Sequence, residues 1–169
     1  MDLFHVLDIA IEREKGTHDF YSQAAKITKD SKGKEAFVWL AHQEIGHFNS
    51  LCRLKEALLE SGGDVKLDRL SPEDEKVIAS MPASEASGAV TPSTTASEAL
   101  QGAIENEKAS IELYRRLERN TADPGAKAML DGLVAEEQTH LLILEAQLKA
   151  WEQSQTFVPL KELPMELLG

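Results

Sequence analysis

The chain of 169 residues is 42% hydrophobic and 28% charged, a composition typical of a globular protein rather than a disordered one. Its formal net charge of −11, without any basic run, argues against nucleic acid or an anionic membrane surface as a partner. No apolar run approaches the roughly 20 residues that cross a bilayer and no basic, cleavable leader is present, so we expect a cytoplasmic protein without a membrane partner.

Apolar residues recur at three-and-four spacing along most of the chain, which predicts an all-α protein. Four long helices are expected, over residues 2–29, 31–60, 96–120 and 124–152. Start signals precede the last three, at Asp30 or Ser31, at the capping-box pair Thr95 and Glu98, and at Asp123 followed by Pro124.

A crossover over residues 62–95 joins the second helix to the third. Within it SPEDEKVIASM predicts a short helix, whereas PASEASGAVTPSTTAS has the composition of a linker. The expected organisation is one bundle over residues 1–152, made of a hairpin over 2–61, the crossover, and a hairpin over 96–152. Residues 153–169 form a C-terminal tail whose apolar side chains could pack on a neighbouring subunit.

The two hairpins form an internal repeat. AIEREKGTHDFY at 10–21 returns as AIENEKASIELY at 103–114, 93 positions later and without a gap. The same offset carries distinctive residues of the first hairpin onto the second: Asp30 onto Asp123, Glu44 onto Glu137, and His47 onto His140. We therefore predict two duplicated hairpins in a four-helix bundle, joined by one crossover that runs the length of the bundle.

One carboxylate lies on the apolar face of each predicted helix. These residues are Glu14, Glu44, Glu107 and Glu137, and Glu-x-x-His spacing adds His47 and His140 to the faces of the second and fourth helices. Buried together, four carboxylates would repel one another, whereas two divalent cations would balance their charge and leave both imidazoles neutral. The sequence therefore predicts a metal centre with these six ligands. The alternative is a decayed duplicate whose acidic residues persist as protonated, hydrogen-bonded pairs.

Other polar residues close to this face receive different roles. Glu136 is set aside as a ligand, because its counterpart in the first hairpin is Gln43. Tyr21 and Tyr114 lie two turns after the carboxylates of their helices, and we expect each phenol in the core with a hydrogen bond to a ligand carboxylate. His18 is expected to be partly buried beside the ligands rather than to bind metal.

Taken together, Glu-x6-Tyr in the first and third helices and Glu-x-x-His in the second and fourth resemble the ferritin-like superfamily, and specifically rubrerythrin-type di-iron proteins. The resemblance covers about residues 5–150. It implies two iron ions per chain, for which manganese or zinc could substitute. It also implies that Glu44 and Glu137 bridge the ions, that Glu14 and His47 complete one position, and that Glu107 and His140 complete the other.

Two departures from rubrerythrins affect the expected function. Cys52 is the only cysteine, so these 169 residues hold no four-cysteine rubredoxin site. Ser110 stands where rubrerythrins carry an additional metal-binding glutamate, so the six-ligand set is closer to the bacterioferritin centre. The resemblance then implies a homodimeric oxidoreductase that reduces peroxide or dioxygen with electrons from a separate donor protein. A ferroxidase that handles iron and a structural bundle with a vestigial metal site are the alternatives.

Overall fold

The computed structural model describes residues 3–60, 70–81 and 89–163, and in these ranges every regular element is a helix. The elements are α1 (Leu3–Ile27), α2 (Ser31–Glu60), α3 (Pro72–Ser80), α4 (Ala96–Asn120), α5 (Pro124–Ser154) and the short 3₁₀ helix η1 (Leu160–Glu162). The all-α prediction is confirmed, and the four long helices begin and end within two residues of their predicted limits. None of the described helices is long and apolar enough to cross a membrane.

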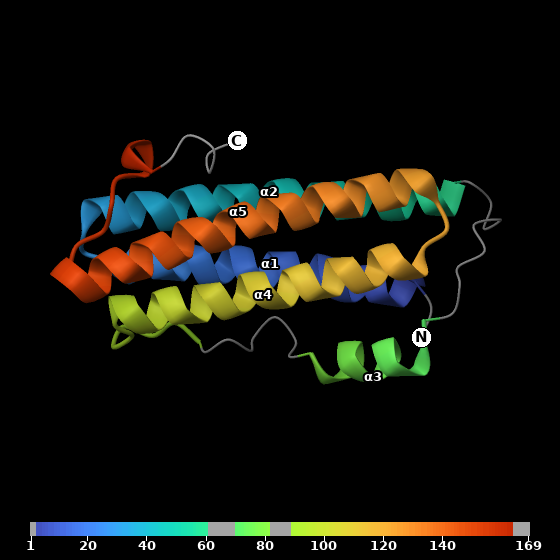
Figure 1. The fold of residues 1–169 in the computed structure, drawn as a ribbon, viewed down its shortest axis with the longest axis horizontal. Helices are drawn as coiled ribbons and strands as arrows, with labels where there is room; N and C mark the ends of the chain where they lie inside the picture. The colour runs from blue at the N-terminus through green and yellow to red at the C-terminus, as the bar shows by residue number, and fades with distance from the viewer. Residues whose placement is uncertain (1–2, 61–69, 82–88, 164–169) are drawn as a thin grey trace.

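The four long helices form two antiparallel hairpins that lie side by side (Figure 1). α1 pairs with α2 and α4 pairs with α5, while α1 also packs against α4 and α2 against α5. α2 ends at one end of the bundle and α4 begins at the other, so the chain returns along the bundle between them (Figure 1). This arrangement confirms the four-helix bundle with one long crossover. Residues 61–69 and 82–88 of the crossover lie outside the described ranges.

The predicted start signals cap their helices. Asp30 Oδ1 accepts hydrogen bonds from the backbone N–H groups of Lys32 and Gly33, at 2.8 and 3.0 Å, at the start of α2. Thr95 and Glu98 form the reciprocal capping box of α4. Such caps satisfy N–H groups that have no partner within their own helix, and each contributes about 1 kcal/mol.

The short helix predicted within the crossover is α3, and it docks on the last turns of α4. Ser71 caps its start by accepting from the backbone N–H of Asp74. Asp74 in turn accepts hydrogen bonds from Arg116 and from Asn120 of α4, the latter at 3.0 Å. Ile78, one turn after Asp74, is buried in the hydrophobic core, so α3 is held by both polar and apolar contacts.

The tail folds back onto its own bundle. Phe157 is buried so closely against α2 that a Cβ at Gly33 would lie 2.6 Å from the phenyl ring. The Gln147 side chain fixes the turn by bonding both the N–H and the carbonyl of Val158, at 2.8 Å each. Leu163 is buried as well. Phe157 and Leu163 therefore pack within their own chain, while residues 164–169 of the predicted tail lie outside the described ranges.

A layer of polar side chains divides the core into two hydrophobic clusters. On α1, Leu7 belongs to one cluster and Tyr21 to the other, and the buried Glu14 lies midway between them. The other three long helices of the bundle follow the same pattern. Apolar packing on both sides thus positions the polar layer and separates it from water.

Candidate metal centre

The polar layer contains all six residues predicted as metal ligands, and none of them is more than 2% exposed. They come from four helices: Glu14 from α1, Glu44 and His47 from α2, Glu107 from α4, and Glu137 and His140 from α5. Donor atoms of the two Glu-x-x-His pairs, on α2 and α5, lie within 4.8 Å of one another. The remaining two carboxylates flank this inner group.

His47 directs its Nδ1 atom at three carboxylates from three different helices. The distances are 3.3 Å to Glu14 Oε2, 3.4 Å to Glu44 Oε2 and 3.1 Å to Glu137 Oε1. The imidazole therefore faces these three carboxylates with its Nδ1 atom. Helical spacing alone accounts for the contact with Glu44, and bundle packing brings in the other two.

His140 repeats this geometry from the second hairpin. Its Nδ1 lies 2.9 Å from Glu137 Oε2, 3.6 Å from Glu44 Oε1 and 3.8 Å from Glu107 Oε1. The ring stacks on that of His47, with centroids 5.3 Å apart and an interplanar angle of 22°. The structure thus brings all six predicted side chains together around one volume.

Two tyrosines tie the hairpins together across this volume. Tyr21 of α1 donates a hydrogen bond to Glu107 Oε1 of α4, and Tyr114 of α4 donates to Glu14 Oε1 of α1. Burial, followed by the nearby carboxylates, raises the pKa of both phenols well above the ordinary value, so both remain protonated donors. The predicted hydrogen bond from each phenol to a carboxylate of the cluster is present, with the partner in the opposite hairpin.

Several inward-facing oxygen and nitrogen atoms of the cluster have no hydrogen-bond partner in the described part of the structure. They are Glu14 Oε2, both carboxylate oxygens of Glu44, Glu137 Oε1 and His47 Nδ1. His47 Nδ1 does lie at ion-pair distance from carboxylate oxygens, but not in hydrogen-bond geometry. Buried polar atoms are rarely left unsatisfied, and a bound cation would satisfy all of these. A carboxylate-rich donor set with one imidazole per ion suits iron or manganese better than zinc, so the residues fit the predicted metals.

Without cations, protons compensate the charge of the cluster. Burial and then repulsion from Glu137 raise the pKa of Glu44, and the same causes raise the pKa of Glu107 to about 8. Burial would lower the pKa of His140, but the neighbouring carboxylates of Glu107 and Glu137 outweigh that effect and raise it to about 9. Burial would raise the pKa of Glu137, but the charge of His47 and the contact with His140 outweigh it, so this carboxyl stays ionised.

Comparison with known proteins now places the chain. The family model described as Rubrerythrin matches residues 5–148. The chain belongs to the rubrerythrin family. This confirms the predicted resemblance, and it covers all six residues of the cluster.

A solved structure supports the fold of this rubrerythrin-family chain. The structure, of a protein from Thermotoga maritima described as a ferritin-like diiron-carboxylate protein, superposes with a TM-score of 0.63 at 19% sequence identity. The match covers 92% of this chain and 97% of that chain. At this identity the likeness shows the ferritin-like fold alone. No curated protein matches the chain.

Glu136, which the sequence comparison set aside, has a role in the cluster that the repeat did not indicate. It does not chelate with His140 of its own helix. Instead its Oε2 accepts a hydrogen bond from Nε2 of His47 on α2, at 2.8 Å. Its side chain is 60% exposed, so this hydrogen bond connects the buried layer with the protein surface.

Arg13 is a second residue that the sequence analysis missed. Although charged, it is only 6% exposed, in the contact between α1 and α4. Its Nε donates to Ser110 Oγ at 3.2 Å, and its Nη2 donates to the backbone carbonyl of Asn106 at 3.0 Å. The position where rubrerythrins carry an additional glutamate therefore holds a hydroxyl bonded to a buried guanidinium. The only signal in the sequence was Arg13 itself, next to Glu14.

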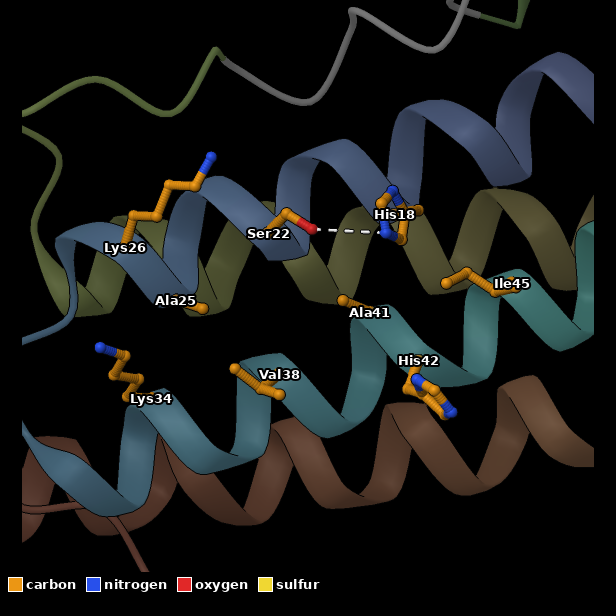
Figure 2. Close-up of a pocket in the computed structure, with 9 residues that line it drawn as sticks. All are labelled: His18, Ser22, Ala25, Lys26, Lys34, Val38, Ala41, His42 and Ile45. Atoms are coloured by element: carbon orange, nitrogen blue, oxygen red, sulfur yellow. Dashed lines mark hydrogen bonds between the residues drawn. The ribbon is translucent and has the colours of Figure 1, made fainter.

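His18 is partly buried, as predicted, but it faces away from the centre. Its Nδ1 lies 3.1 Å from Asp19 and its Nε2 lies 3.5 Å from Ser22 Oγ. It lines a surface groove of about 350 Å³ between α1 and α2, which it shares with His42 (Figure 2). The described part of the structure shows no contact between His18 and the six clustered residues.

Proposed function

We propose that this rubrerythrin-family chain is a di-iron carboxylate oxidoreductase. It reduces peroxide, with dioxygen as a slower oxidant, using electrons from a separate donor protein. The observation that carries the proposal is the convergence of four carboxylates and two imidazole Nδ1 atoms in a buried layer, where five of the inward-facing atoms have no hydrogen-bond partner. The family match and the likeness to a protein described as a diiron-carboxylate protein support it.

Two carboxylates, those of Glu44 and Glu137, each face both histidines with a different oxygen, an arrangement that suits a pair of ions bridged by carboxylates. Glu44 offers Oε2 to His47 and Oε1 to His140, and Glu137 offers Oε1 to His47 and Oε2 to His140. Each of these two carboxylates would therefore bridge. Glu14 would complete the position of His47, and Glu107 would complete that of His140.

The protein itself would position the ligands, supply their negative charge and exclude water from the metal site. Two ferrous ions held there would supply the two electrons that convert hydrogen peroxide, with two protons, into two water molecules. Tyr114 holds Oε1 of Glu14 and leaves Oε2 facing His47, whereas Tyr21 holds Oε1 of Glu107, the same oxygen that faces His140. The hydrophobic clusters on both sides exclude water from the layer, which strengthens the attraction between carboxylates and cations.

Anaerobic reconstitution with ferrous ion tests the proposal. We expect about two iron ions per chain and repeated peroxide turnover with an added electron donor, since six ligands and four negative charges match two divalent ions. Glu44→Ala combined with Glu137→Ala should abolish both. The matched control is Glu12→Ala with Glu105→Ala, a second repeated pair of glutamates that is exposed. If the Glu44/Glu137 variant binds metal as the wild type does, the proposal is wrong. If the wild type takes up many iron ions per chain, the protein handles iron instead of reducing peroxide.

We also propose that the protein is a homodimer located in the cytoplasm. Phe157 and Leu163 are buried in their own chain, so the interface would use other apolar residues. Val38, Ile45 and Leu59 of α2 are large hydrophobic side chains that are exposed. Light scattering that gives the mass of one chain decides against the dimer.

A further inference from the structure

The two hairpins repeat their ligands but differ in what supports the two histidines. Nε2 of His47 bonds the carboxylate of Glu136 at 2.8 Å. The residue 93 positions before Glu136 is Gln43, which has no charge to offer the corresponding side of the centre. His140 meets instead the edge of Trp39, with ring centroids 5.5 Å apart at 81°. The pseudo-symmetry of the centre is therefore broken outside the six ligands.

The contact with Glu136 fixes which nitrogen of His47 is available. A carboxylate only accepts, so Nε2 carries the hydrogen and Nδ1 keeps its lone pair when the ring is neutral. Nδ1 is the atom that faces Glu14, Glu44 and Glu137 at 3.1 to 3.4 Å. The hydrogen bond thus selects the tautomer, holds the ring plane, and makes Nδ1 a better electron donor.

We propose that Glu136 is a positioning residue for His47 and that it makes the two metal positions unequal. The position completed by Glu14 and His47 takes metal first, and the position completed by Glu107 and His140 takes it second. This inference rests on the proposed metal centre, which it deepens by giving the two ions an order. Loss of such an outer carboxylate typically costs 10–100-fold in metal affinity.

Titration of the metal-free full-length protein with Co²⁺ alone, followed by its visible absorption and by calorimetry, tests the order. The wild type is expected to bind two ions in two steps. Glu136→Ala should weaken the first step by about 10–100-fold, and Glu136→Gln, which keeps an acceptor without the charge, should weaken it less. The matched gain-of-function variant is Gln43→Glu, which should strengthen the second step by supplying the missing carboxylate.

Two further measurements separate positioning from a merely structural role. In the zinc-loaded protein, the Nε2 proton of His47 should exchange slowly with water by NMR, and quickly in Glu136→Ala. In a His47→Asn background Glu136→Ala should have no further effect on Co²⁺ binding, whereas in a His140→Asn background it should keep its effect. Because Glu136 is exposed, the far-ultraviolet circular dichroism of these variants should match the wild type.

The outcomes distinguish this inference from the proposed function. If the wild type binds two Co²⁺ ions in one step of equal affinity, or if Glu136→Ala changes only the weaker step or neither, the order is wrong and the metal centre stands. If the wild type binds no metal ion, the centre and the order fall together.

Discussion

Tyr21 on α1 donates its phenol hydrogen bond to Glu107 on α4, the carboxylate of the opposite hairpin. The equivalent residue of the second hairpin, Tyr114, donates in the same way to Glu14 of the first. Two crossed hydrogen bonds therefore join the hairpins at the level of the polar layer. Both rings are fully buried. The two hairpins therefore brace each other, because each one holds a clustered carboxylate of the other through a tyrosine hydrogen bond.

Removing the brace should loosen the centre without unfolding the bundle. Tyr21→Phe and Tyr114→Phe keep the buried ring and remove only the hydroxyl. Each should lower the free energy of unfolding by about 1–3 kcal/mol, because a buried carboxylate loses its donor. Thermal unfolding of metal-free and metal-loaded protein measures this. Equal stability of wild type and both variants would show that the crossed bonds contribute nothing.

The metal-free protein should become less stable as the pH rises. The pKa of Glu107 is raised to about 8 from 4.5, and that of His140 to about 9 from 6.5. Both groups bind their protons more tightly in the folded chain, so their stabilisation is present at low pH and is lost as the pH rises through 8 and 9. We expect the melting temperature in chelator to fall by several degrees between about pH 6 and pH 9. A flat profile would contradict the buried, protonated cluster.

Metal-loaded protein is the control for that pH dependence. Bound cations replace the protons that compensate the carboxylates, so the melting temperature should rise by mass action and lose most of its dependence on alkaline pH. Glu137, whose pKa is lowered, has the opposite sign and loses its stabilisation only as the pH falls below its usual range.

Two glutamine substitutions should have opposite effects on the metal-free protein. The pKa of Glu44 is raised by burial and by its carboxylate neighbours, so Glu44→Gln relieves repulsion and should raise the melting temperature by a few degrees. Glu137 is ionised between His47 and His140, and Glu137→Gln should cost on the order of 3 kcal/mol, because it leaves buried imidazolium charge uncompensated. Both variants should weaken metal binding. Stabilisation by Glu137→Gln would show that its carboxylate, too, is under net repulsion.

The helices and the six clustered side chains could be predicted from the sequence because local geometry and repetition determine them. Glu44 and His47 share a helical face at a spacing of three, and the offset of 93 requires the same of Glu137 and His140. Apolar neighbours on that face fix its direction into the core. Neither the shared face nor its direction into the core depends on the angle at which the helices pack.

The contact between Glu136 and His47 could not be predicted in this way. It depends on how α5 is rotated and shifted against α2, which no periodicity within one helix records. Arg13 is a similar case, since a charged residue beside Glu14 is ordinarily solvated. Its burial follows from acceptors on α4, the Ser110 hydroxyl and the Asn106 carbonyl, that only the packed bundle brings within reach.

Arg13 also determines what an added carboxylate at position 110 would do. Ser110→Glu restores the residue type that rubrerythrins carry there, but the guanidinium of Arg13 lies 3.2 Å from the present hydroxyl. We expect the new carboxylate to pair with Arg13 in this buried site and not with metal, because a bidentate pair with guanidinium is strongly favoured there. The rate of peroxide reduction should therefore not increase in Ser110→Glu alone.

The double variant Arg13→Met with Ser110→Glu separates the two effects. With the guanidinium gone, the carboxylate is available to the centre and the peroxide rate should rise above that of the wild type. Arg13→Met alone is the control, and it should cost about 1–3 kcal/mol of stability because the Ser110 hydroxyl and the Asn106 carbonyl lose a buried donor. Stopped-flow mixing of anaerobic ferrous-loaded protein with peroxide, together with iron analysis of each variant, measures the outcome. If Ser110→Glu alone raises the peroxide rate as much as the double variant, Arg13 does not compete with the centre for that carboxylate.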